Sequence, residues 1–292
     1  MRAMILGAGG MLGHDLVATA FDAVFLSPFH RTELDITDTR ALAAAVARVR
    51  PDVVLNTAAY TAVDAAESEP EAAFRVNAEA VGELGRIAAR AGARVVHFSS
   101  DHVFDGTASA PYREESLTSP LNVYGTSKLA GEKALGGSGA HFLIIRTQWL
   151  FGVYGRSFPR TMWERATQRL PTRVVTDQLG RPTSTIDLAR ATWKLVLAAI
   201  TGTVHVANAG QASWYEVAGR VFAAAGAPAL LTPCRSDEYP TVARRPVHAV
   251  LDTARADALM GGPLPTWRDA LERFLQELVS PTVGLPASPR SG

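Results

Sequence analysis

A tyrosine and a lysine four positions apart are the residues best suited to acid–base chemistry. Tyr124 and Lys128 stand in "LNVYGTSKLAGEKAL", residues 121–135, a stretch with the pattern of a helix. Residues at i and i+4 share one helix face, so both side chains can point into the same cleft. A nearby ammonium lowers the pKa of a phenol, and such a tyrosine can give its proton to a carbonyl oxygen as a hydride reaches the carbonyl carbon. The spacing alone is weak, because it arises by chance in roughly every second or third chain of this length.

The glycine-rich turn "GAGGMLG" is a second signal. It sets Gly7, Gly10 and Gly13 in a G-x-x-G-x-x-G spacing directly after an N-terminal apolar run. Glycines let the chain turn tightly and let backbone N–H groups approach a pyrophosphate, while the next helix offers its positive end to that anion. A strand–helix turn without a ligand is the alternative. The position of the motif favours a dinucleotide, whose nicotinamide ribose Lys128 could also bind.

The strand-like stretch "VVHFSSD" ends in Ser99, Ser100 and Asp101 just before a loop. In open α/β sheets, ligands bind at the carboxyl ends of the strands. A serine there can hydrogen-bond both a substrate carbonyl and the hydroxyl of Tyr124, although serines also end strands for turn-forming reasons. The glycine turn, the serine and the tyrosine–lysine pair, which follow in this order along the chain, together supply the groups that hydride transfer to a carbonyl requires.

The loop "SPFHRTELDITD" bears on the choice of cofactor. An acid at the end of the second strand favours NAD, whereas an arginine nearby can accommodate the 2′-phosphate of NADP. The strand end lacks an acid, and His30 and Arg31 follow closely. We therefore expect NADPH or NADH, with NADPH mildly favoured, while a solvated loop role for Arg31 stays open. Asp35 and Ile36 could lie beside the adenine.

Short apolar runs alternate with helical patterns in the first half of the chain. Strands are predicted near residues 3–8, 23–28, 52–59, 94–101 and 141–152, with helices near 11–21, 37–50, 69–92 and 121–135. Strands that are apolar throughout, alternating with helices, indicate a parallel sheet covered on both faces. We predict an α/β fold with a doubly wound parallel sheet of the Rossmann type and a smaller C-terminal substrate-binding domain.

The predicted domains are a dinucleotide-binding domain over residues 1–145 and a substrate domain over 146–280. Some segments of the second are expected to return to the main sheet. Residues 281–292 are rich in Pro, Ser and Gly and are predicted to form a flexible tail.

Composition excludes several classes of protein. The 29 basic and 28 acidic residues give a net charge of +1, with no basic cluster typical of nucleic-acid binding. No stretch approaches the roughly 20 apolar residues that a membrane span needs. The single cysteine, Cys234, excludes an internal disulfide and a cysteine-based metal site. We expect a cytoplasmic protein with neither a nucleic-acid nor a membrane partner.

Taken together, the sequence resembles the dTDP-4-dehydrorhamnose reductase family of the extended short-chain dehydrogenase/reductase superfamily, from residue 4 to about 279. The stretches that carry the resemblance are "GAGGMLG", "RPDVVLNTAAYTAVDAAESEPEAAFRVNAEA", "SSDHVFDGT", "SPLNVYGTSKLAGE", "RTQWLFG", "DQLGRPTSTIDLA" and "RRPVHAVLDT". The resemblance implies NAD(P)H-dependent reduction of the 4-keto group of dTDP-6-deoxy-L-lyxo-4-hexulose to dTDP-L-rhamnose. The hydride would come from the nicotinamide and the proton from Tyr124. The substrate domain would then bind a sugar nucleotide.

Carried over residue by residue, the resemblance implies cofactor contacts in three places. They are Gly10, Met11 and Leu12 in the glycine-rich turn, Asp35 and Ile36 after the second strand, and Ala59, Tyr60 and Thr61 after the third. Tyr124 and Lys128 would contact the cofactor as well as act in catalysis.

The resemblance also implies a substrate site. Ser100 matches the family's Ser/Thr position and Asp101 the acid thought to tune the tyrosine. Trp149 matches a tryptophan that packs on the sugar nucleotide. Arg245 matches a position expected to hold the diphosphate, since a guanidinium suits bidentate phosphate binding. His102 replaces a tyrosine of the usual "TDYVF", and we expect it to line the pocket without catalytic work.

Other interpretations stay open. A reductase or epimerase of another nucleotide sugar would share the same hydride chemistry. A non-catalytic regulatory subunit like that of methionine adenosyltransferase has similar motifs, although retention of Ser100, Tyr124 and Lys128 argues against it. Some relatives bind Mg²⁺ through acids at a dimer interface. Asp15 and Asp187 stand near such positions, but we predict no metal site, and a homodimer is left open.

Overall fold

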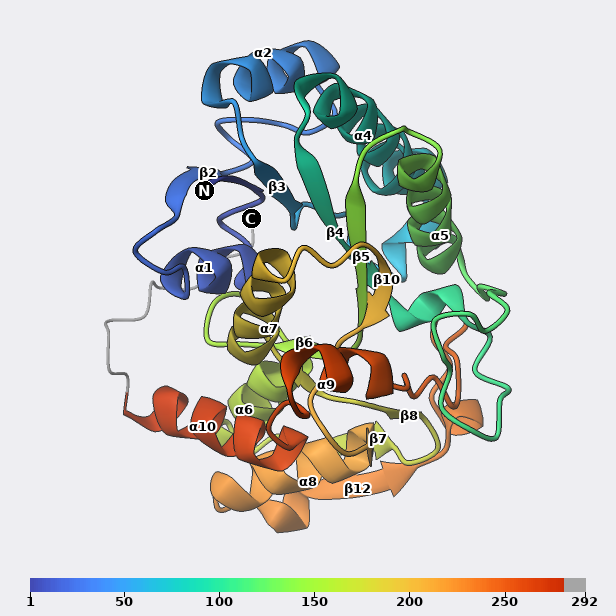
Figure 1. Ribbon diagram of the computed structural model, residues 1–292. Helices are drawn as coiled ribbons and strands as arrows, with labels where there is room; N and C mark the ends of the chain where they lie inside the picture. The colour runs from blue at the N-terminus through green and yellow to red at the C-terminus, as the bar shows by residue number, and fades with distance from the viewer. Residues whose placement is uncertain (281–292) are drawn as a thin grey trace.

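Six parallel strands form the central sheet of the computed structural model, which describes residues 1–280 (Figure 1). The predicted tail lies outside the described residues. The strand order is β10-β5-β4-β3-β1-β2. These strands are β1 (Arg2–Leu6), β2 (Phe25–Phe29), β3 (Val53–Asn56), β4 (Arg94–Ser100), β5 (Phe142–Thr147) and β10 (Gly202–His205). The order reverses between β1 and β3, so the loop after β1 lies at the switch point where doubly wound sheets bind ligands.

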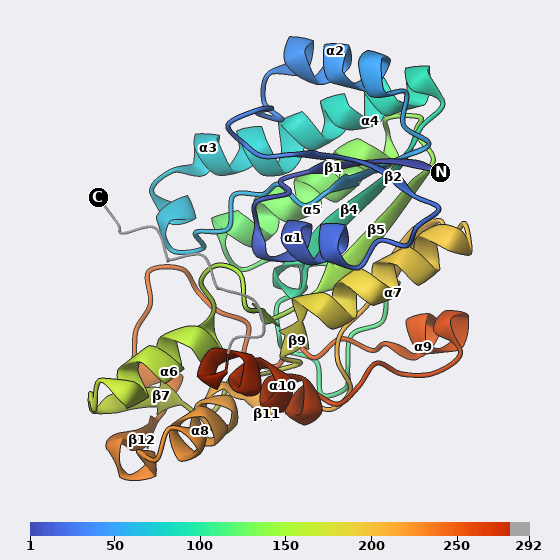
Figure 2. The same cartoon turned by 90° about the vertical axis from the view of Figure 1, so that its left-hand side faces the viewer.

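Alternating side chains of the strands enter two separate cores. On β1, Ala3 and Ile5 pack toward α1 (Met11–Ala18) and α7 (Thr185–Leu197), whereas Met4 and Leu6 pack toward α2 (Thr39–Val49) and α4 (Ala80–Ala91). Figure 2 shows α2 and α4 on one side of the sheet and α1 and α7 on the other. Burial on both faces explains the unbroken apolar runs. The doubly wound parallel sheet predicted from the sequence is confirmed.

Helix ends follow local chemistry that the sequence displays. The carboxylate of Asp38 caps α2 by accepting a hydrogen bond from the backbone N–H of Ala41. Gly92 ends α4 with φ +69°, a left-handed conformation that favours glycine. The predicted helix 69–92 forms as α3 (Pro70–Phe74), a π-helical turn η2 (Arg75–Glu79) and α4.

The second half of the chain builds the lower part of the molecule in Figure 1. Its remaining helices are α6 (Phe158–Thr167), α8 (Trp214–Ala224), α9 (Ala254–Met260) and α10 (Trp267–Val279). Its small sheets pair β11 (Ala212–Ser213) with β8 (Leu179–Gly180), β12 (Leu231–Cys234) with β7 (Thr172–Val175), and β6 (Leu150–Phe151) with β9 (Thr183–Ser184). A third core lies among α6, α8 and α10.

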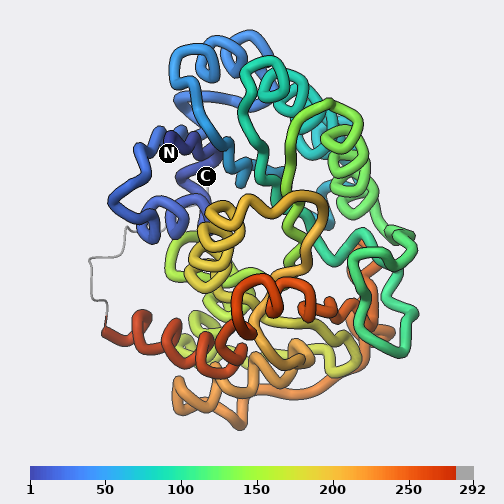
Figure 3. The backbone as a smooth tube through the Cα atoms, in the orientation of Figure 1, coloured from blue at the N-terminus to red at the C-terminus, as the bar shows by residue number. Residues whose placement is uncertain are grey.

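Several later segments return to the main sheet. β10 pairs with β5, and α7 packs on α1. β5 itself crosses the predicted boundary between residues 145 and 146, so the two-domain division stays a prediction. In Figure 3 the orange segment before α9 lies beside the green loop that precedes α5 (Val123–Gly136). A β-bridge between Tyr112 and Leu251 joins the two segments. None of the described helices is long and apolar enough to cross a bilayer.

Candidate active site

The glycine-rich turn packs closely at the end of β1. Gly7 has φ +79°, and a Cβ there would lie 2.8 Å from the backbone nitrogen of Ala58. A Cβ on Gly13 would collide with the carbonyl oxygen of Gly7. Gly9 and Gly10 are exposed at the start of α1, where helix N–H groups are free to meet an anion. These glycines therefore form a turn that a phosphate can approach.

The carboxyl end of β4 carries the predicted serine and aspartate. The hydroxyl of Ser100 donates to Oδ1 of Asp101 at 2.9 Å and accepts from the backbone N–H of His102 at 3.2 Å. Both side chains are almost completely buried. Burial raises the pKa of Asp101 above its ordinary value, and the nearby His102 and the Ser100 hydrogen bond partly oppose this.

Tyr124 lies in the first turn of α5, which Asn122 caps by accepting from the N–H of Gly125 at 2.7 Å. Burial raises the pKa of the Tyr124 phenol to about 12, although a hydrogen bond with Ser100 lowers it in part. Ser127 fixes the same turn by donating to the carbonyl of Tyr124 at 2.8 Å. The phenol is therefore held in its protonated form next to Ser100.

Lys128 lies one turn later on α5 and is 2% exposed. Its Nζ donates to the carbonyl of Phe98 at 2.6 Å and lies 3.3 Å from Nε2 of His97. Burial lowers the pKa of Lys128 to about 8, and the charge of Glu132 opposes the change. The expected lowering of the Tyr124 pKa by this ammonium is wrong. Burial has the largest effect on the pKa of both groups, and it raises that of Tyr124.

His102 and Trp149 both border the same space. The ring of His102 meets that of Tyr124 edge-on, with centroids 5.3 Å apart, and its Nδ1 lies 3.0 Å from the amide of Asn122. Burial lowers the pKa of His102, so the ring is neutral at physiological pH. Trp149 has φ +51° and stacks on Trp214 with centroids 3.6 Å apart. Gly180 makes room for it, since a Cβ there would lie 2.5 Å from the Trp149 ring.

Arg245 reaches the same space but has a carboxylate partner. One of its guanidinium nitrogens lies 2.9 Å from Oδ2 of Asp64, whose other oxygen accepts from the N–H of Ala243. Arg165 lies on α6 and has no carboxylate partner in the part of the chain that the structure describes. Its guanidinium donates to the hydroxyl of Thr172 at 2.8 Å and to the carbonyl of Pro171 at 3.0 Å. Both cations can therefore serve an anionic ligand.

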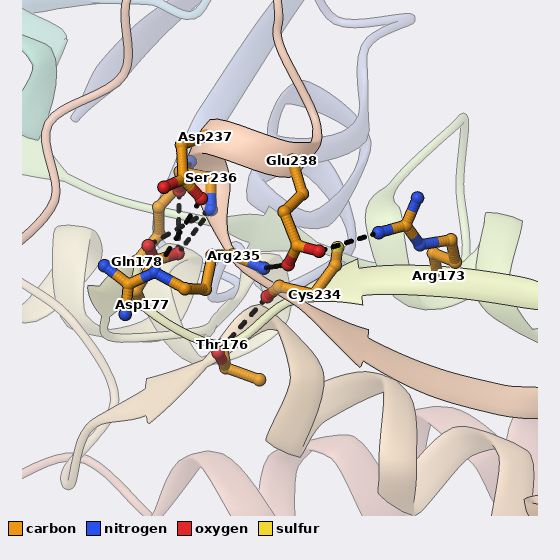
Figure 4. Close-up of polar contacts among 9 residues, drawn as sticks. All are labelled: Arg173, Thr176, Asp177, Gln178, Cys234, Arg235, Ser236, Asp237 and Glu238. Carbon is orange, nitrogen blue, oxygen red and sulfur yellow. Dashed lines mark hydrogen bonds and ion pairs between the residues drawn. The ribbon is translucent and has the colours of Figure 1, made fainter.

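A network of polar contacts joins residues 173–178 to residues 234–238 (Figure 4). Asp177 accepts from both the backbone N–H and the hydroxyl of Ser236, and Thr176 donates to the carbonyl of Cys234. Glu238 accepts from the N–H of Arg235 and lies 3.4 Å from Arg173. These contacts join the ends of β7 and β12.

One cavity of about 1010 Å³ is lined by many of these residues, although not by Lys128 or the glycines of the turn. Its lining includes the predicted residues Met11, Thr61, Ser100, Asp101, His102, Tyr124, Trp149 and Arg245. It also includes residues that the sequence did not predict, among them Thr147, Gln148, Arg156, Arg165, Gln178 and Trp214. Thr147 ends β5 and Gln148 follows it, so the rule that ligands bind at the carboxyl ends of strands could have found them. Nothing in the sequence marks Arg165.

The other predicted cofactor residues lie at the ends of β2 and β3. Arg31 is exposed, with a distant ion pair to Asp35 at 3.8 Å. The carboxylate of Asp35 accepts from the N–H and hydroxyl of Thr37, which lowers its pKa. Ile36 is buried against the core beside α2. Tyr60 is held by Asn77 at its backbone N–H and carbonyl, and its hydroxyl donates to Glu69 at 2.8 Å. Ala59 lies in the loop after β3, whereas Leu12 is buried in the first turn of α1.

The cavity fits a nicotinamide dinucleotide. The glycine turn leaves room for the phosphates of such a cofactor. In addition, the hydroxyls of Ser99 and Thr147 are buried in the cavity wall and have no hydrogen-bond partner among residues 1–280. Buried polar atoms are normally paired, so the amide and hydroxyl groups of a bound cofactor suit these positions.

Asp15 and Asp187, which stand near the positions where some relatives bind Mg²⁺, have partners within the chain. Asp187 binds Nη2 of Arg273 at 2.6 Å and the amide of Asn208 at 2.8 Å. Burial raises the pKa of Asp15, and a hydrogen bond with Thr185 opposes this. Within residues 1–280, no group of three or more His, Cys, Asp or Glu side chains is arranged to hold a metal ion.

Comparison with known proteins places the chain among sugar-nucleotide enzymes. The family model of the RmlD substrate binding domain matches residues 1–280. A dTDP-4-dehydrorhamnose reductase from Burkholderia thailandensis is 39% identical, covering 96% of this chain and 100% of that protein. A dTDP-4-keto-6-deoxy-D-glucose reductase from Streptomyces niveus is also 39% identical, covering 92% and 95%. The crystal structure of dTDP-4-dehydrorhamnose reductase from Bacillus anthracis in complex with NADP has a TM-score of 0.91 at 35% identity, covering 94% and 99%.

Proposed function

Because this chain belongs to the family of the RmlD substrate binding domain, we propose that it reduces dTDP-4-dehydrorhamnose to dTDP-L-rhamnose with NADPH or NADH. The observation that carries the proposal is the buried phenol of Tyr124 beside Ser100, in a cavity that also reaches the glycine-rich turn. The Bacillus anthracis relative, whose crystal structure contains NADP, supports NADPH as the reductant.

Tyr124 supplies the proton of this reaction. The cofactor, when bound, supplies the hydride. A phenol whose pKa is about 12 is fully protonated at neutral pH and is ready to protonate the oxygen that the hydride leaves negatively charged. The hydroxyl of Ser100 can hold the same oxygen, because it lies between Asp101 and Tyr124. Lys128, with a pKa of about 8, can then return a proton to the phenolate.

The rest of the cavity suits a nucleotide diphosphate sugar. Trp149 stacked on Trp214 offers a flat aromatic wall of the kind on which sugar or base rings pack. Arg165 and Arg245 offer guanidinium groups for a diphosphate. His102 is neutral and lies against Tyr124, where it can contact the sugar.

A reductase of a different dTDP-linked keto sugar is the second candidate. The Streptomyces niveus enzyme is as similar to this chain, at 39% identity, as the Burkholderia thailandensis reductase is. His102 also departs from the family pattern at the predicted sugar-binding position. A purely regulatory dinucleotide-binding role fits less well, because the described residues include the complete set of Ser100, Tyr124 and Lys128.

Replacing Tyr124 by Phe tests the proposal. We expect loss of most turnover, since the proton donor is gone, while NADPH binding followed by cofactor fluorescence stays within about threefold. Ser127→Ala is a matched control on the same helix turn, because it alters the packing of α5 without removing the donor. Turnover by the Tyr124→Phe protein near the unmodified rate would contradict the assignment.

Three further assignments are also proposals. We infer a sugar-nucleotide domain that begins near residue 146, a homodimer, and a location in the cytoplasm. The polar cavity lining of residues 147–246 supports the first, and the single cysteine supports the last. Light scattering of the purified chain tests the homodimer.

A further inference from the structure

A histidine that the reaction does not touch lies behind the catalytic lysine. His97 is in the middle of β4, fully buried, and pairs in register with Asn56 on β3. Its Nε2 lies 3.3 Å from Nζ of Lys128, and its Nδ1 lies 3.3 Å from the amide nitrogen of Asn56. Burial and then the neighbouring lysine hold the pKa of His97 well below its ordinary value, so the ring is neutral.

The contacts of Asn56 decide which ring nitrogen of His97 carries the proton. Oδ1 of Asn56 accepts from the backbone N–H of Ala58 at 3.2 Å, which turns the NH₂ group toward His97. An amide NH₂ can only donate, so Nδ1 must accept and the proton lies on Nε2. The Nε2–H therefore points at Nζ of Lys128.

An N–H group that faces Nζ can form a hydrogen bond with only one of the two charge states of Lys128. The ammonium has three donors and no acceptor, so it cannot receive this N–H. The neutral amine has a lone pair and can accept from His97 while it donates to the carbonyl of Phe98 at 2.6 Å. The neutral amine is also the form that Lys128 takes after it gives a proton to the phenolate of Tyr124.

We propose that His97 is a positioning residue for this reaction. Its Nε2–H holds the amine of Lys128 against the carbonyl of Phe98, and its Nδ1 links the lysine through Asn56 to the loop after β3. That loop contains Ala59, Tyr60 and Thr61, the predicted cofactor contacts. The inference rests on the proposed reduction. In it, the ammonium passes one proton to the phenolate, becomes the amine, and is stabilised in that state by His97.

The proton position can be read on the free protein without substrate. Long-range ¹H–¹⁵N NMR spectra of protein labelled at histidine distinguish the two neutral tautomers, and the signal missing from His97→Gln identifies residue 97 among the 7 histidines. We expect the proton on Nε2. A proton on Nδ1 would overturn the proposal. Absence of turnover would count against the proposed function and leave this result intact.

Two variants of equal length test the consequence for catalysis. Glutamine at position 97 can still present an N–H near the position of Nε2, whereas methionine fills similar space without a donor. We expect His97→Gln to keep kcat within about threefold and His97→Met to lower it by roughly tenfold or more. The KM for the nucleotide sugar should change little in either, because His97 does not line the cavity.

The pH profile separates this role from simple packing. The titratable and charged groups that act on Nζ are His97 on β4 and Glu132 on α5, and only the charge of Glu132 favours the ammonium. Removing the Nε2–H removes a partner of the neutral amine, so the alkaline limb of kcat should move to higher pH in His97→Met. A lowered melting temperature with kcat and the alkaline limb unchanged would show a packing role and overturn the proposal.

Discussion

Replacing Lys128 by methionine separates the cost of burying its ammonium from its use in catalysis. Burial lowers the pKa of this lysine from 10.5 to about 8. A difference of this size corresponds to about 3 kcal/mol of lost stability at neutral pH. Methionine has similar length and no charge, so it removes this cost together with the hydrogen bond to Phe98.

The sign of the pH dependence follows from the two pKa values. Between pH 8 and 10.5 the unfolded chain binds more protons at this lysine than the folded chain does. Its contribution to the free energy of unfolding is therefore lowest below about pH 8 and rises as the pH increases. Relative to Lys128→Met, the unmodified protein should gain about 2 kcal/mol between about pH 7 and pH 10. The carbonyl of Phe98 and the neutral ring of His97 do not titrate in this range, so the pH dependence comes from the protonation of Lys128 itself.

Urea unfolding followed by circular dichroism at both pH values measures this difference. In parallel, kcat of the variant should fall by roughly a hundredfold or more, because the substitution removes the group proposed to return the proton to Tyr124. A stability difference that is the same at both pH values would refute the reasoning, since it would mean that folding does not desolvate the ammonium.

Three other substitutions have defined outcomes. Arg31→Ala should weaken NADPH binding several-fold in a fluorescence titration and leave NADH unchanged, because Arg31 is exposed at the end of β2 with only a 3.8 Å ion pair; equal losses for both cofactors would exclude a 2′-phosphate contact. Gly125→Ala should cost about 1–3 kcal/mol in urea unfolding, since its Cβ would collide with the backbone carbonyl oxygen of His102 and lie 3.1 Å from Cβ of Pro120. Glu132→Gln should cost about 3–5 kcal/mol, because it leaves Arg146, bound at 2.7 Å and 2.9 Å, as an uncompensated buried charge; a loss below about 1 kcal/mol would contradict this.

Local signals made much of the fold predictable. Apolar runs indicate strands buried on both faces, and Asp38 and Gly92 mark helix ends because their roles depend on neighbours within four residues. That Ser100 and Tyr124 lie together in the candidate site was predictable for a related reason. Ser100 ends a strand and Tyr124 begins a helix, and the topology of a doubly wound sheet brings such ends to one edge.

Contacts between distant segments were not predictable in this way. The stacking of Trp149 on Trp214 joins residues 65 positions apart, and it depends on a left-handed backbone at Trp149 that no local pattern marks. The same holds for Asp64, which fixes Arg245 from the loop after β3. The pKa of Tyr124 was predicted in the wrong direction, because burial depends on the packing of the whole site.

Turnover of defined nucleotide sugars tests the central claim most directly. The purified protein is incubated with enzymatically prepared dTDP-4-keto-6-deoxy-L-hexose and NADPH, and cofactor absorbance is followed, with GDP- and UDP-linked analogues in parallel. The proposed function predicts oxidation of NADPH with the dTDP-linked substrate and formation of dTDP-L-rhamnose. Oxidation with a GDP- or UDP-linked analogue, and none with the dTDP-linked sugar, would contradict it.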